Sequence, residues 1–151
     1  MRQIVFTLLA LVSISVGHAA SPPKPTKSEY LLSTGAGIAL SVDDGARYGM
    51  NFAVLKDVPA PIYVTILFEN PEKGGAPLRQ DATLPAGATE LVAKSERLPM
   101  VRNNKKYLVE VKLYSDEARA HLLGTHKQQV LFAVPKQLIQ QIEQEFGTKI
   151  Q

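Results

Sequence analysis

Apolar side chains recur at every second position in several separate stretches of this chain, and this two-residue period constrains its fold most. The cleanest series covers residues 106–115, and its apolar members are Tyr107, Val109, Val111 and Leu113. Because successive side chains of a β-strand point to opposite faces, such a series predicts a strand with one buried face.

Further stretches of this kind follow one another along the chain. Strands are expected at residues 38–42, 48–54, 62–68, 78–84, 90–98, 106–115 and 122–134. Turn-forming residues separate them, notably Asp43-Asp44-Gly45 and Asn103-Asn104. About six to eight short strands without interleaved helices favour an antiparallel β-sandwich, with a small closed β-barrel as the alternative.

The expected layout resembles that of immunoglobulin-like and fibronectin type III domains over residues 37 to 134. This resemblance implies two antiparallel sheets packed face to face. The chain contains no cysteine and no tryptophan. It therefore lacks the disulfide and tryptophan core of antibody domains, and the resemblance implies no particular family.

The period changes after Pro135. Leu138, Ile139, Ile142 and Phe146 follow at helical spacing, and Gly147 is suited to the end of a helix. Residues 135–151 are therefore expected to form an amphipathic helix and a tail that cover an open end of the sandwich. The alternative is a docking helix that binds another protein. It would present Leu138, Ile142 and Phe146.

The first twenty residues predict a cleaved signal peptide, with Arg2 before an apolar run and small residues at Ala19 and Ala20. The run is shorter than the roughly 20 residues that span a membrane, so no anchor is expected in the mature chain. Without a cysteine, lipid attachment at the cleavage point is excluded. Residues 21–29 are rich in proline and predict a linker before a domain at 30–134. The protein is expected to be periplasmic or secreted.

Charge is modest, with 17 Lys and Arg residues against 14 Asp and Glu residues, and this does not favour binding to nucleic acid. One cluster of cations is opposed only by Glu96. It consists of Lys94, Arg97, Arg102, Lys105 and Lys106. If successive strands bring these residues to one end of the sandwich, they can bind an acidic protein, a phosphate-bearing lipid headgroup or an anionic polysaccharide. Alternatively, they solvate an exposed turn and protect a sheet edge.

Catalytic motifs are missing from the sequence: it has no nucleophile elbow, zinc-binding helix or phosphate-binding loop. No cofactor and no metal site is predicted. His121 and His126 are expected on opposite faces of a strand, as surface residues. A carboxylate-based hydrolase would need the fold to bring together two acidic residues. The candidates lie at predicted turns and are Asp43, Asp44, Asp116 and Glu117.

These observations favour an exported, non-catalytic binding or accessory module that acts through interaction with an envelope protein. Two alternatives stay open. One is a small hydrolase built on carboxylates, and the other is a binder of anionic envelope glycan or lipid through the cluster of cations.

Overall fold

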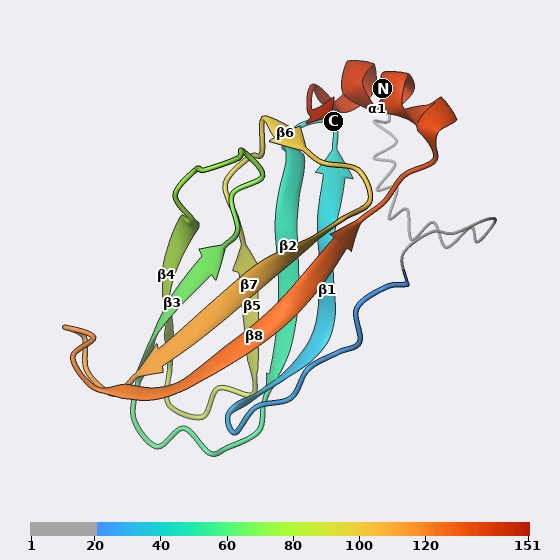
Figure 1. Ribbon diagram of the computed structural model, residues 1–151. Coiled ribbons are helices and arrows are strands. Elements are labelled where there is room, and N and C mark those ends of the chain that lie inside the picture. Colours follow the sequence, from blue (N-terminus) through green and yellow to red (C-terminus); the bar gives the residue numbers. More distant parts are fainter. Residues whose placement is uncertain (1–20) are drawn as a thin grey trace, which may run out of the picture.

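A computed structural model of the protein describes residues 21–151, and the expected signal peptide lies outside these residues. Figure 1 shows two layers of strands with a short helix across one end. The strands are β1 (Leu31–Ser41), β2 (Gly45–Val54), β3 (Ile62–Phe68), β4 (Leu78–Leu84), β5 (Glu90–Lys94), β6 (Met100–Val101), β7 (Lys105–Tyr114), β8 (Leu122–Phe132) and β9 (Lys149–Ile150). A 3-10 turn, η1 (Lys136–Leu138), leads into the helix α1 (Ile139–Phe146).

The longer strands form two antiparallel sheets. One sheet has the strand order β1-β2-β5, and the other has the order β4-β3-β7-β8. The short strands β6 and β9 pair in parallel. Both sheets end in edge strands within the described part of the chain, so the closed barrel is wrong. The prediction of a mainly β, antiparallel fold with one short helix is confirmed.

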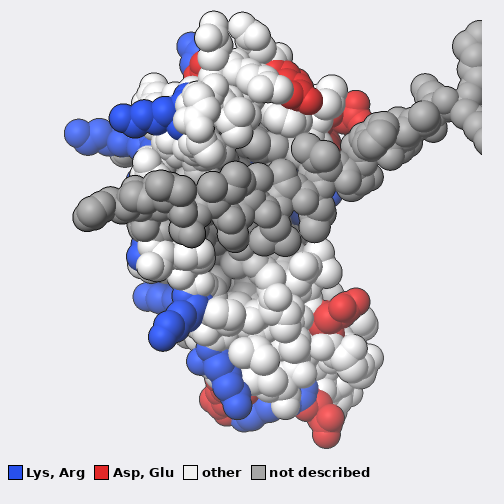
Figure 2. Space-filling view, turned by 90° about the vertical axis from the view of Figure 1, so that its right-hand side faces the viewer, with Lys and Arg blue, Asp and Glu red and all other residues white. Residues whose placement is uncertain are grey.

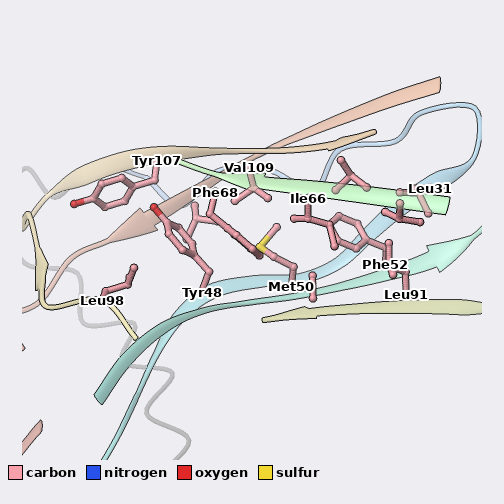
Figure 3. Packing of buried hydrophobic residues seen from close by; sticks show 14 of the residues in the cluster. Leu31, Tyr48, Met50, Phe52, Ile66, Phe68, Leu91, Leu98, Tyr107 and Val109 are labelled. Atoms are coloured by element: carbon pink, nitrogen blue, oxygen red, sulfur yellow. The ribbon is translucent and has the colours of Figure 1, made fainter. Parts of the chain in front are cut away.

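The buried faces of the two sheets share one core, seen from close by in Figure 3. The ring of Tyr48 in β2 stacks on Phe68 in β3 with 5.1 Å between centroids, and meets Tyr107 in β7 edge-on at 6.0 Å. The alternating apolar residues of β3 and β7 are all buried, which confirms the two-residue period. They are Ile62, Val64, Ile66, Phe68, Tyr107, Val109, Val111 and Leu113.

Two strands differ from their predicted bounds by four residues or more. β1 begins at Leu31 instead of residue 38, and it pairs with β2 along its whole length, with an irregularity between Ser33 and Gly35. Small and polar residues dominate this first half of β1, so the sequence carries little strand signal there. β5 ends at Lys94 instead of residue 98. Beyond it, the Ser95 amide donates to the Tyr48 carbonyl oxygen at 3.2 Å, and an isolated bridge pairs Leu98 with Ala46.

Buried tyrosine hydroxyls connect strands to the chain around them. The amide of Arg102 donates a hydrogen bond to the Tyr107 hydroxyl at 2.6 Å, which holds the chain just before β7. The Tyr48 hydroxyl donates to the carbonyl oxygen of Glu69 at 2.7 Å. Burial raises the pKa of both phenols, so they act only as neutral hydrogen-bonding groups.

The C-terminal segment packs into the end of the sandwich beside α1. The Thr148 side chain is fully buried, where its hydroxyl accepts from the Ala46 amide at 3.1 Å and donates to the Leu98 carbonyl at 3.3 Å. Ile150 joins the core. Gly147 ends α1 in the left-handed conformation, with φ 64°, as its position in the sequence predicts.

Removal of the Tyr107 hydroxyl tests this packing. Tyr107→Phe is expected to lower the free energy of unfolding by about 1–3 kcal/mol, because it leaves the Arg102 amide without its acceptor. Tyr114→Phe, on the outer side of the same strand, is expected to change it by less than about 0.5 kcal/mol. Urea unfolding of both variants measures the difference, and equal stabilities would contradict the proposed role of the bond.

Candidate functional site

Residues 21–30, here called the N-terminal segment, run along the edge strand β8 (Figure 1). The buried side chain of Gln128 accepts from the Thr26 amide at 2.8 Å and donates to the Lys24 carbonyl at 3.1 Å. The Thr26 hydroxyl donates to the carbonyl of Lys127 at 2.6 Å. The part of the chain expected to be a linker therefore makes ordered contacts with the sheet. These contacts use mainly backbone groups, which composition does not reveal.

His126 lies where the two sheets meet and is only 1 % exposed. Its Nε2 atom is 2.9 Å from the Ser33 hydroxyl of β1 and 3.0 Å from the Thr26 hydroxyl. Its Nδ1 atom is 2.9 Å from the Ser28 hydroxyl, and its ring meets Phe52 edge-on at 5.3 Å. Burial lowers the pKa of His126, so the ring is neutral at neutral pH.

The prediction that His126 is a surface residue is wrong, because the N-terminal segment and β1 cover it. The sequence did contain a sign of this burial. His126 is separated from Val130 and Phe132 by an even number of positions, so all three side chains point to the same, inward face of β8. His121 lies before β8 and is exposed, with its Nδ1 atom 3.2 Å from a carboxylate oxygen of Asp116. The two histidines are thus not a pair.

A groove of about 380 Å³ lies between the N-terminal segment and the outer face of β7 and β8. Residues 21–24 and 26 form one side. The other side is formed by Lys106, Leu108, Lys127 and Gln129. Leu108 and Gln129 are direct cross-strand partners, and they separate Lys106 on β7 from Lys127 on β8. With Lys24, three exposed lysines from three segments line one groove, and none of its described lining residues is acidic.

The groove belongs to the more basic side of the molecule. In Figure 2, Lys and Arg side chains gather along the left-hand edge, which is the side of β7 and β8, whereas Asp and Glu lie mainly at the right and the bottom. Lys24, Lys106 and Lys127 form no ion pair with any residue in 21–151. Glu110 is the cross-strand partner of Lys127, but its carboxylate lies 3.7 Å from Lys112 Nζ instead.

The structure divides the cluster of cations expected from the sequence. Lys94 is exposed on β5, in the three-stranded sheet, and Lys106 is exposed on β7, in the four-stranded sheet. Arg102 is half-buried before β7. The cluster is thus divided between the two sheets, because the strands that carry Lys94 and Lys106 follow each other in sequence but belong to different sheets.

The other two cations of the cluster have bonding partners within the fold. Arg97 Nη2 donates to the carbonyl oxygens of Phe146 at 3.3 Å and Gly147 at 3.4 Å, at the end of α1. Lys105 Nζ lies 2.7 Å from a Glu69 carboxylate oxygen. Burial opposes the ionisation of Glu69, but hydrogen bonds from Lys105 and a backbone amide outweigh it and lower the pKa of this carboxyl. Both cations therefore support the structure.

The candidate catalytic carboxylates do not come together. Asp43 and Asp44 lie in the turn between β1 and β2, whereas Asp116 and Glu117 lie in the turn between β7 and β8, at the other end of the sandwich (Figure 1). Neither pair lines the groove. Hydrogen bonds from backbone amides, including that of Ala120, lower the pKa of Asp116 and stabilise its carboxylate as a turn-forming group.

The apolar stripe of α1 mainly faces the sandwich. Ile139 and Ile142 pack against the core, and Phe146 is half-buried. Leu138, in the preceding 3-10 turn, is 37 % exposed. Of the residues expected to dock on a partner, Leu138 is therefore the most accessible.

Within residues 21–151, no group of three His, Cys, Asp or Glu side chains is placed to hold a metal ion. No helix in the same part of the chain is both long and apolar enough to cross a membrane.

Comparison with known proteins identifies no relative. No family model matches the chain, and no curated protein matches it. Among solved structures, Bacteroides uniformis β-glucuronidase matches with a TM-score of 0.43 and 18% identity, over 68% of this chain and 13% of that chain. The Pseudomonas fluorescens alkylpurine DNA glycosylase AlkC, bound to DNA containing an abasic site analog, matches with a TM-score of 0.35 and 20% identity, over 68% and 29%. The chain spans only a small part of either structure, and these similarities identify neither fold family nor function.

The buried histidine predicts a pH-dependent stability. Because the folded protein lowers the pKa of His126 below its ordinary value of 6.5, the unfolded chain binds the proton more readily. Stability is therefore complete well above pH 6.5 and falls as the pH drops through 6.5 toward the lowered pKa. Melting temperatures measured from pH 7.5 to 5.5 are expected to decline in the natural protein and in His121→Asn. They are expected to stay nearly level in His126→Asn, and an unchanged slope in that variant would contradict this assignment.

A second comparison tests whether the C-terminal segment packs or docks. Ile150→Ala is expected to lower the free energy of unfolding by about 2–5 kcal/mol, because it removes a core side chain. Leu138→Ala is expected to cost less than about 1 kcal/mol, since the side chain is exposed. Chemical unfolding of both variants gives the values. A negligible effect of Ile150→Ala would show that the tail is not part of the stable fold.

Proposed function

We propose that the chain is an exported, non-catalytic binding module built on an immunoglobulin-like β-sandwich. It acts in the periplasm or outside the cell, where the groove beside the N-terminal segment binds an anionic component of the envelope. The observation that carries the proposal is the convergence of Lys24, Lys106 and Lys127 on one groove without an acidic partner among its described residues.

The strand order supports the immunoglobulin-like assignment. β3, β7 and β8 are adjacent in the order of strands C, F and G of such domains, and β1, β2 and β5 match strands A, B and E. In these domains a tyrosine near the start of strand F bonds back to the chain a few residues upstream. Tyr107 in β7 makes this contact with the Arg102 amide.

The leader pattern and the lack of cysteine support export by a route without lipid attachment. The stability of a module without disulfides has to come from its core and its buried polar contacts. The hydrogen bonds of Gln128 and His126 to the N-terminal segment are contacts of this kind.

Binding is favoured over hydrolysis by the positions of the charged groups. A hydrolase would need two carboxylates in one concave site, whereas the acidic pairs considered above lie at opposite ends of the sandwich. The sequence favoured a protein as the partner. The groove instead favours the alternative partner, an anionic glycan or lipid. Its lysines are concentrated in a concave site, where they attract a compact negative group.

Photocrosslinking in the native envelope tests the proposal. A photoreactive side chain at position 108, in the groove, is expected to form adducts with an envelope component. The same group at position 92, on the outer face of the other sheet, is expected to form none, although Val92 is 57 % exposed and Leu108 only 39 %. Adducts from position 92 alone, or from neither position, would contradict the proposal. Adducts from position 108 that contain only protein would favour the protein partner predicted from the sequence.

A further inference from the structure

We infer that the groove beside the N-terminal segment binds a phosphate monoester carried on a sugar-sized group. This inference rests on the proposed function, since it names the chemical class of ligand for the same groove.

The positive charge of the groove favours a phosphate monoester over the carboxylate of an acidic sugar. Lys24, Lys106 and Lys127 bring three ammonium groups to the groove, and none has an ion-pair partner in the described chain. A phosphate monoester carries a charge of about −1.5 to −2 at pH 7, whereas a carboxylate of an acidic sugar carries only one negative charge. The phosphate offsets more of the cationic charge. Lysine also suits this ligand, because its ammonium acts as a compact point charge that donates to several phosphate oxygens.

The volume of the groove favours a ligand larger than a free phosphate ion. The groove is open to solvent and has a volume of about 380 Å³, which is in the range of small-molecule sites. At roughly 30 Å³ per water molecule it holds on the order of a dozen waters, so phosphate alone would leave most of it hydrated. The pyrrolidine rings of Pro22 and Pro23 and the side chain of Leu108 offer apolar surface to the carbon face of a sugar ring. Gln129 offers an amide for its hydroxyl groups.

The lysine of the N-terminal segment is held in place by the fold. Gln128, only 2 % exposed, donates to the Lys24 carbonyl and accepts from the Thr26 amide. The backbone on this side of the groove is therefore ordered before a ligand arrives, which reduces the entropy lost on binding. Gln128 is a positioning residue, because it faces inward and does not line the groove.

Calorimetric titration of the purified protein with glucose 6-phosphate tests the inference. Saturable binding is expected for this compound, much weaker binding for glucuronate, and none for glucose. In the double variant Lys106→Ala/Lys127→Ala the affinity is expected to fall at least about tenfold, because each lysine donates a charge-assisted hydrogen bond. The control double variant Lys73→Ala/Lys136→Ala removes the same charge from exposed positions outside the groove and is expected to bind normally.

Equal affinity in the two double variants, or equal binding of glucose and glucose 6-phosphate, would overturn the inference. Melting temperatures confirm that both variants fold. Vesicles containing phosphatidic acid, a lipid with a phosphate monoester, distinguish the two sources. Binding to them that is lost in Lys106→Ala/Lys127→Ala assigns the ligand to a lipid headgroup, and binding to glucose 6-phosphate alone assigns it to a soluble sugar phosphate.

The failures of the two proposals are distinguishable. If position 108 crosslinks in the envelope but no phosphate compound binds, the ligand class is wrong and the binding module stands. If glucose 6-phosphate binds in the groove but position 108 gives no adduct in the envelope, the proposed function is wrong and the chemical preference of the site stands.

Discussion

The contact between the N-terminal segment and β8 determines how this sandwich is closed. β8 is an edge strand, and uncovered edge strands invite pairing with other chains. The segment covers it through Thr26, whose hydroxyl and amide bond to Lys127 and Gln128. His126 adds hydrogen bonds to the same segment and to Ser33 of β1, across the line where the two sheets meet. One set of polar contacts thus covers the edge and joins the layers, in a chain without disulfides.

The opposite side of the sandwich uses a similar solution. There the edge strands β4 and β5 lie next to each other, and the Gln80 side chain of β4 accepts from the Lys94 amide of β5 at 3.0 Å. A glutamine therefore satisfies backbone groups at both lateral openings, Gln80 on one side and Gln128 on the other. Because glutamine has both donors and an acceptor, it can bond backbone groups that do not meet in ladder register.

The sequence predicts individual strands better than their arrangement. The alternation in 62–68 and 106–115 identifies the core faces of β3 and β7 correctly, because each series buries one face completely. The first half of β1 escapes detection, since Ser33 and Gly35 lack the β-branched and aromatic side chains that mark strands. The division of the cluster of cations between two sheets was not predicted, because the residues of a strand do not show to which sheet it belongs. The groove was missed for a related reason, as Lys24 and Lys127 come from opposite ends of the domain.

Some residues of the groove take no part in the contacts that hold the fold together, whereas the position of another depends on those contacts. Lys106 and Lys127 project from the outer face of the four-stranded sheet, and they form no ion pair within the described chain, so the fold does not depend on their charge. Lys24 differs, because the contacts of Gln128 and His126 with the N-terminal segment determine its position. Because buried His126 bonds to Thr26 and Ser28 of that segment, protonation of its ring is expected to weaken the attachment. Acid would therefore act on the groove by loosening the side that the N-terminal segment forms.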